Sequence, residues 1–275
     1  MLLKFDEYRI QFKPTGSDAS LWQDAMKNKN ETFSKILDEK LIVQYKGKDL
    51  NYKGIALKNS KYYFRIANSK KKRIEKDFHI QHVKDEPSSS IFIWNNPNEQ
   101  RIFIESDITA FTNSKVLAGI FERALNMSLY DYNLRAEIKG EIEESEFWDL
   151  AERYKDKITQ ISFKFTYPNL PSAHRDISED ITAATRSLNA DEAGISFTAN
   201  NSDTLSNINP DNENLVNLNR AASIQGMPVG IRVKGMKMQK TGSTLKHFEA
   251  EEIDFEDYDQ LEKFADKFFN SDTDQ

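Results

Sequence analysis

The chain contains no cysteine, which excludes disulfides, thiolate metal sites and cysteine nucleophiles together. It also has no long hydrophobic run, and no stretch approaches the ~20 apolar residues that a membrane-spanning helix needs. The first twelve residues, MLLKFDEYRIQF, carry charges at Lys4, Asp6 and Glu7, so they lack the apolar core of a signal peptide. We therefore expect a soluble, cytoplasmic protein with no membrane span of its own.

Several catalytic and ligand-binding patterns are also missing. The sequence has no G-x-x-x-x-G-K-[ST] phosphate loop and no G-x-S-x-G nucleophile turn. Its four histidines are scattered: His79 and His82 are three positions apart and would face opposite sides of a strand, and His174 and His247 are isolated. We therefore expect no metal centre and no cofactor.

Charge is divided unevenly along the chain. Residues 1–104 carry 20 Lys and Arg against 13 Asp and Glu, a net of +7, whereas residues 105–275 carry 18 against 31, a net of −13. Such asymmetry bears on partners and solubility rather than on fold, and it indicates a surface near the N-terminus that faces a polyanion. The acidic end of the chain could imitate nucleic-acid phosphates or shield the basic half. The favoured alternative is a capped helix end whose Asp and Glu side chains are all solvated.

Hydrophobic patterning predicts an α+β fold with largely antiparallel sheets, packed helices and a C-terminal helix-hairpin-helix. We expect three regions: a basic, β-rich region at 1–104, a central α/β region at 105–171, and 172–275, which begins with a polar, linker-like segment. A hairpin turn is expected around Asn95–Asn98, and the order β-α-β-α-β from Arg101 to Pro168.

The helices after residue 105 have the clearest signals. TNSKVLAGIFERALNMSL has apolar residues at helical spacing, with Thr112 or Ser114 as a possible cap. Near the C-terminus, NENLVNLNRAASIQG reads as a helix ended by Gly226. VGIRVKGMKMQ-KTGS-TLKHFEAEEIDF then reads as a hairpin, followed by an amphipathic helix that docks by Leu261, Phe264 and Phe268.

The longest run of basic residues follows an aromatic strand, KYYFRI. Its members are Lys70, Lys71, Lys72, Arg73 and Lys76. Such cations can contact phosphates, and Tyr62 or Tyr63 could stack on bases, so this cluster is the candidate contact with DNA or RNA. The alternative is a solvated turn whose lysines serve solubility.

A second pattern suggests hydrolysis of nucleic acid. Glu137 and Lys139 form an E-x-K pair on an expected strand, as in metal-dependent nucleases that use two carboxylates to hold Mg²⁺ and a lysine beside the attacking water. The second carboxylate could be Glu105, Asp107 or Asp131. An alternating, exposed strand face explains the pair without chemistry.

Three segments together resemble uncharacterised bacterial protein families that occur in phage-defence loci. They are RIFIESDITAFTNSKVLAGIFERAL, ISFKFTYPNLP and NLNRAASIQGMPVGIRVKG, within residues 101–250. The resemblance implies a bacterial, cytoplasmic protein that works with a partner supplying enzymatic or membrane activity. It assigns no functional residue.

These observations lead to one main hypothesis and two alternatives. The main hypothesis is a non-enzymatic nucleic-acid-binding or sensor subunit of an antiphage defence system, acting with a protein partner or as a homo-oligomer. One alternative is a metal-dependent nuclease built on Glu137 and Lys139, with Asp107. The other is a phage-encoded inhibitor or interaction protein that uses its acidic end as a decoy.

Overall fold

The structure, a computed structural model, describes residues 2–15, 24–97, 100–166, 192–200 and 203–270, with five isolated positions between 184 and 190. It has the α+β fold expected from the sequence. The chain forms two units, one from Met1–Ile138 together with His247–Gln275, the other from Lys139–Lys246. These limits differ from the expected divisions at 104 and 171, because the C-terminal segment returns to pair with the first strand.

The first unit is built on a sheet whose described strands run in the order β10-β1-β9-β8-β5-β4, with β15 also paired to β1. The strands are β1 (Leu2–Pro14), β4 (Tyr52–Leu57), β5 (Lys61–Ala67), β8 (Ser88–Asn95), β9 (Gln100–Glu105), β10 (Leu134–Gly140) and β15 (His247–Glu251). From β15 through β1 and β9 to β4, neighbouring strands are antiparallel. The β8–β9 pairing confirms the hairpin expected at Asn95–Asn98. A small separate hairpin joins β2 (Gln44–Tyr45) to β3 (Lys48–Asp49).

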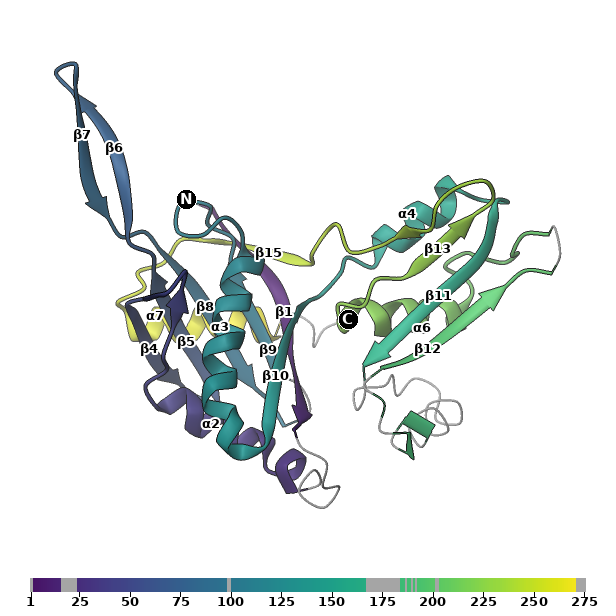
Figure 1. The fold of residues 1–275 in the computed structure, drawn as a ribbon, viewed down its shortest axis with the longest axis horizontal. Coiled ribbons are helices and arrows are strands. Elements are labelled where there is room, and N and C mark those ends of the chain that lie inside the picture. The colour runs from purple at the N-terminus through teal and green to yellow at the C-terminus, as the bar shows by residue number, and fades with distance from the viewer. Residues whose placement is uncertain are drawn as a thin grey trace. The chain divides into compact units, whose positions relative to one another are not determined.

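Helices cover both faces of this sheet (Figure 1). The helices α2 (Lys29–Asp38) and α3 (Ser114–Leu129) pack on one face, and α7 (Tyr258–Asn270) packs on the other. Adjacent residues of β5 therefore point into different cores: Phe64 meets Phe121 of α3 at 5.4 Å between ring centroids, while Tyr63 belongs to the α7 cluster. Because both faces are buried, the strands read as continuous apolar runs such as YYF and IFI rather than as an alternation.

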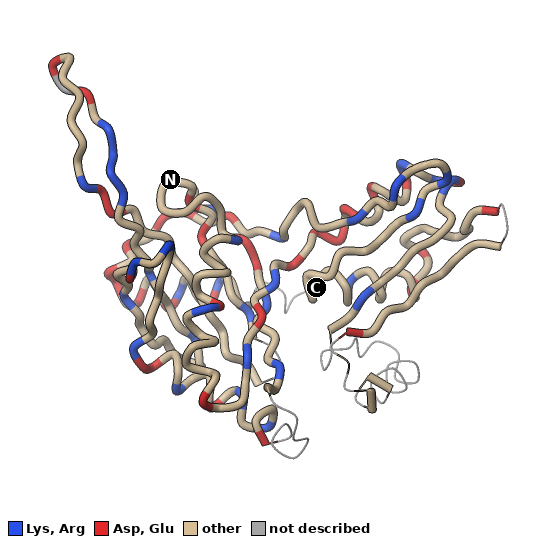
Figure 2. Tube along the Cα trace, in the orientation of Figure 1, with Lys and Arg blue, Asp and Glu red and all other residues tan. Residues whose placement is uncertain are grey.

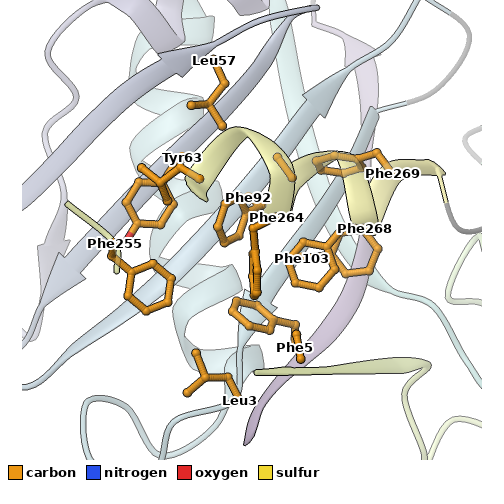
Figure 3. Packing of buried hydrophobic residues seen from close by; sticks show 13 residues of the cluster. Leu3, Phe5, Leu57, Tyr63, Phe92, Phe103, Phe255, Phe264, Phe268 and Phe269 are labelled. Atoms are coloured by element: carbon orange, nitrogen blue, oxygen red, sulfur yellow. The ribbon is translucent and has the colours of Figure 1, made fainter. Parts of the chain in front are cut away.

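The α7 cluster is rich in phenylalanine (Figure 3). Phe264 lies 5.7 Å from Phe5 and 5.3 Å from Phe92 between ring centroids, and Phe268 stacks on Phe103 at 4.7 Å. Leu261, Phe264 and Phe268 are at most 7% exposed. The expected docking of the C-terminal helix is therefore confirmed.

The β-α-β-α-β order from Arg101 to Pro168 is also confirmed, with one correction at a helix cap. Its members are β9, α3, β10, α4 (Ser145–Arg153) and β11 (Ile158–Thr166). The cap of α3 is neither Thr112 nor Ser114 but Asn113, whose side chain accepts from the Val116 N–H at 3.0 Å.

The second unit has a four-stranded sheet in the order β12-β11-β13-β14 among its described residues. The further elements are β12 (Glu192–Thr198), α6 (Glu213–Ile224), β13 (Gly230–Val233) and β14 (Gln239–Lys240). The strand β12 lies in the segment read as linker-like from sequence, where it pairs with β11 over seven positions. The part of that segment from 172 to 191 falls almost wholly outside the described residues.

Two C-terminal expectations had different outcomes. The helix α6 ends next to the expected glycine: its last residue is Ile224, Gln225 is its C-cap, and Gly226 follows with a φ of +63°. A Cβ on Gly226 would lie 2.5 Å from the Gly140 carbonyl oxygen. A hairpin does follow α6, but it joins β13 to β14 through 234–238, and residues 247–251 pair with β1 instead. The expected turn at KTGS was therefore wrong. The alternation identified the strands but not their partners.

Candidate nucleic-acid interface

The basic run lies on a two-stranded hairpin formed by β6 (Lys70–Lys76) and β7 (His79–Asp85). Its strands pair antiparallel over seven positions, from Lys70 opposite Asp85 to Lys76 opposite His79. The hairpin leaves the main sheet between β5 and β8 and extends beyond it (Figure 1). As a result, most of its side chains are exposed to solvent.

Positive charge lies on both faces of this hairpin. Residues 70–85 include six Lys or Arg and three Asp or Glu. Because side chains alternate along a strand, Lys70 and Lys72 lie on one face and Lys71 and Arg73 on the other. Figure 2 shows the four as a continuous basic stretch along β6.

The cross-strand register is favourable at the base of the hairpin, where Lys70 lies opposite Asp85, but not along the rest of the basic run. Lys71 lies directly opposite Lys84, and Arg73 lies opposite His82. Like charges placed directly opposite each other destabilise a strand pair. Lys84 instead forms an ion pair with Glu86, two residues further along the chain, with 2.7 Å between its ammonium nitrogen and the carboxylate oxygen. This contact lowers the pKa of the Glu86 carboxyl.

The base of the hairpin is held by hydrogen bonds. Asn68 donates its backbone N–H to Pro87 at 2.9 Å and its side-chain amide to the Ala110 carbonyl at 2.7 Å. The Lys70 ammonium donates to the Thr109 carbonyl at 2.5 Å. Asp107, which the sequence suggested as a metal ligand, accepts from the backbone N–H and hydroxyl of Thr109 and so shapes this anchoring loop.

The structure removes Tyr62 and Tyr63 from the candidate interface. Tyr62 is 6% exposed and Tyr63 is fully buried. Burial raises the pKa of Tyr62, which also bonds Ser34, and burial raises the pKa of Tyr63 to about 12, with a bond to Ser90 at 3.4 Å. Neither ring can stack on a base while the sheet is intact.

The exposed apolar residues of the hairpin were missed from the sequence. Phe78, at the turn, is 96% exposed, and Ile80 and Val83 on β7 are 53% and 37% exposed. The sequence signal that could have revealed them is Asp77-Phe78, which forms a two-residue turn between two strands of seven residues each. The aromatic partners expected from the sequence were instead Tyr62 and Tyr63 on the preceding strand. The side chain of Lys76, the last member of the basic run, lies outside the described residues.

Glu137 and Lys139 do not form a metal site with Asp107 in the described structure. The Glu137 carboxylate lies 2.9 Å from the Lys13 ammonium and 3.7 Å from the Arg135 guanidinium. The Lys139 ammonium lies 3.4 Å from the Thr166 hydroxyl and 3.5 Å from the Met227 sulfur. Across the described residues, no group of three or more His, Asp or Glu is placed to hold a metal.

The other nominated metal ligands have separate structural surroundings. Glu105 accepts from the Ser90 N–H at 2.8 Å, and burial raises the pKa of its carboxyl. Asp131 is exposed in the short turn after α3. His79 and His82 lie on opposite faces of the hairpin, as expected, and His174 lies outside the described residues.

The acidic end is partly used to hold the first unit together. Asp266 pairs with Lys61, and Glu256 pairs with Lys53 at 2.5 Å. Glu262 accepts from the Lys58 N–H at 2.6 Å. These contacts account for three acidic residues that a decoy surface would otherwise present. The partners come from the basic N-terminal region, but none from the hairpin.

Comparison with known proteins gives a family but no activity. No curated protein matches the chain. Within the described residues, no helix has both the length and the apolar character required to cross a bilayer. One family model, described as a domain of unknown function (DUF4747), matches residues 96–269, a span that begins after the hairpin and ends in α7. The chain belongs to the DUF4747 family.

Proposed function

We propose that this protein is a non-enzymatic nucleic-acid-binding subunit of a bacterial antiphage defence system, and that the β6–β7 hairpin makes the contact. The observation that carries the proposal is a projecting two-stranded ribbon with six cations among its sixteen residues. A two-stranded ribbon can enter the major or the minor groove of a duplex, and its lysines can neutralise phosphates and release counterions.

The charge of the hairpin supports a partner outside the chain. Lys71 and Lys84 are held opposite each other at a cost to the hairpin, which the Lys84–Glu86 ion pair offsets at Lys84 alone. Elsewhere in the first unit, Lys53 and Lys61 have carboxylate partners. A bound polyanion would turn the unfavourable arrangement of the hairpin into a favourable one.

The test compares two charge-reversal variants. Lys71→Glu, Lys72→Glu and Arg73→Glu are combined in the hairpin variant, and the matched control combines Lys40→Glu, Lys48→Glu and Lys58→Glu at exposed positions outside the hairpin. Fluorescence anisotropy is measured with labelled single- and double-stranded DNA and RNA between about 50 and 200 mM salt.

The hairpin variant should lose affinity, and the dependence of log affinity on log salt should fall by about 0.9 for each duplex phosphate contact removed. The control variant should resemble the wild type. Equal losses in both variants, or no wild-type binding at the lowest salt concentration, would contradict the proposal.

The non-enzymatic part of the proposal has its own test. The pure protein should leave labelled single- and double-stranded substrates intact in Mg²⁺ or Mn²⁺. Cleavage that disappears in both Glu137→Ala and Lys139→Ala would establish the nuclease alternative instead.

The defence setting rests on the resemblance of the segments within residues 101–250, and a partner protein would supply the effector activity. Cells that carry the gene with its genomic neighbours should resist phage, and the hairpin variant should remove this resistance. Unchanged plaque counts with and without the intact locus would contradict the assignment to defence.

A further inference from the structure

The tip of the hairpin holds a phenylalanine in an unusual backbone position. Asp77 and Phe78 form the two-residue turn, with φ values of +51° and +62°. Turns with positive φ at both positions match the twist of a hairpin, and they favour Asn or Asp first and Gly second. Asp77 fits this preference. Phe78 does not, because a bulky side chain is disfavoured at positive φ.

The Phe78 ring gains no compensating contact within the described part of the chain. It is 96% exposed and takes part in none of the ring-ring or cation-ring contacts found there. The phenylalanines of the α7 cluster, by contrast, are at most 7% exposed apart from the partly buried Phe248. A strained backbone and a solvated ring both disfavour the free hairpin, so the residue is best explained by a bound state.

We propose that Phe78 is a wedge that inserts between stacked base pairs of double-stranded nucleic acid. This inference rests on the proposed function of the hairpin. Proteins that bind the minor groove insert apolar side chains that separate a base step and kink the duplex, and the bend then brings more protein surface into contact. The ring supplies the apolar wedge, and the strands behind it supply the cations.

The spacing along the hairpin suits this arrangement. Lys71, Lys72 and Arg73 lie five to seven residues before Phe78, or about 16–23 Å along an extended strand. That distance corresponds to roughly five to seven base-pair steps of a duplex. A hairpin that follows a groove could thus place its tip at one step and its basic run on phosphates further along. Single strands, which have no stacked pair to open, would use only the cations.

The test uses a duplex of about 30 base pairs with a donor and an acceptor dye at its ends and 2-aminopurine at its flexible TA steps. Wild-type protein should raise both energy transfer and 2-aminopurine fluorescence. Phe78→Ala should abolish both changes and weaken binding by about 5- to 150-fold, in proportion to a lost stacking contact. Its salt dependence should stay that of the wild type, since every cation remains.

Three further variants isolate the role of the ring. Phe78→Trp should restore both signals, and Ile80→Ala, an apolar truncation beside the tip, should retain them. Phe78→Gly places the favoured residue at this positive-φ position, so it should stabilise the hairpin and slow hydrogen exchange of the β6–β7 amides. The variant should nevertheless lose the increases in energy transfer and 2-aminopurine fluorescence. This combination would show that the ring is kept for binding and not for the stability of the hairpin.

The outcomes separate this inference from the proposed function. Wild-type protein that binds the duplex without bending or unstacking it would overturn the wedge and leave the proposed function standing. Bending that persists in Phe78→Ala would also overturn the wedge. If that variant also lost a protein that co-purifies with the wild type, the Phe78 ring would instead be a contact with a protein partner. A wild-type protein that binds no duplex would overturn the wedge, and one that binds no single strand either would overturn the proposed function as well.

Discussion

Buried polar side chains hold the C-terminal helix in ways that its sequence hides. Glu262 lies in a run of acidic residues that looked uniformly solvated, yet it is only 9% exposed. Its carboxylate accepts from the Lys58 N–H at 2.6 Å and from the Tyr258 hydroxyl at 2.8 Å. It therefore fixes the turn between β4 and β5 to α7.

Glu262→Ala should lower the free energy of unfolding by about 1–3 kcal/mol, because it leaves a backbone donor without its charged acceptor. Thermal denaturation of the purified protein checks this, and Asp259→Ala, at an exposed position on the same helix, is the control. Equal melting temperatures for the wild type and Glu262→Ala would show that water replaces the carboxylate at no cost.

Asp257 gives α7 a pH-dependent cap. Its carboxylate accepts from the Gln260 side-chain amide at 3.0 Å and from the backbone N–H groups of Gln260 and Asp259, and these bonds lower the pKa of the Asp257 carboxyl. A lowered pKa means that the cap stabilises the fold above the unfolded-state pKa of about 3.9, and that this stabilisation is lost as the pH falls through the folded-state pKa.

Asp257→Asn should remove this dependence, because an amide caps a helix but does not titrate. The difference in unfolding free energy between wild type and variant should be constant above pH ~5. As the pH falls below this value, the wild type should lose stability relative to the variant. Urea denaturation across this pH range measures it. A difference that is the same at every pH would mean that the Asp257 carboxylate does not cap the helix.

Residue-scale prediction from sequence failed where burial was not visible in the pattern. Tyr62 and Tyr63 stand close to a basic run, so they looked accessible, but β5 is covered on both faces and hides them. Phe78 was overlooked because it is a single apolar residue in a polar stretch. Its exposure depends on the hairpin leaving the sheet, which no local pattern encodes.

At the scale of elements, the phenylalanines of α7 connect the helix to four strands. Phe264 and Phe268 contact rings from β1, β8 and β9, and Phe268 also meets Phe248 of β15 at 4.8 Å. Aromatic pairs of this kind contribute beyond the area they bury. The helix thus closes the second face of the sheet.

Phe264→Ala and Phe268→Ala should each lower the free energy of unfolding by about 3–5 kcal/mol, from lost contacts and the cavity left behind. Phe78→Ala is the matched control, since it makes the same truncation at an exposed turn. Calorimetry should show large losses for the first two and none for the control. A melting temperature that Phe268→Ala leaves unchanged would mean that α7 does not depend on this cluster.

Elements were predictable from sequence where their signals are local. The apolar spacing within α3 and α7 and the turn at Asn95–Asn98 are such signals, and all three were found. Strand partners were not, because 247–251 pairs with a strand more than two hundred residues earlier in the chain. β12 was missed since only Ile195 and Phe197 mark its apolar positions, and one of these is 44% exposed.

At the scale of the whole molecule, the division of charge is less complete than the sequence suggested. The acidic end belongs to the same unit as the basic N-terminal region, and it pairs there with Lys53 and Lys61. The basic run of the β6–β7 hairpin lies outside this unit's main sheet, because among the described residues β6 and β7 pair only with each other. A chain-wide count could indicate a polyanion-binding surface, but only the topology could locate it on the hairpin.

That topology allows the central claim to be tested by removing the hairpin. Replacing residues 69–86 with an Asn-Gly turn should leave the main sheet and its helices intact, because β6 and β7 contribute no strand to it. The melting temperature should stay close to that of the wild type, and the affinity for a DNA duplex at about 50 mM salt should fall at least as far as in the charge-reversal variant. A shortened protein that melts normally and binds duplex with wild-type affinity would contradict the account.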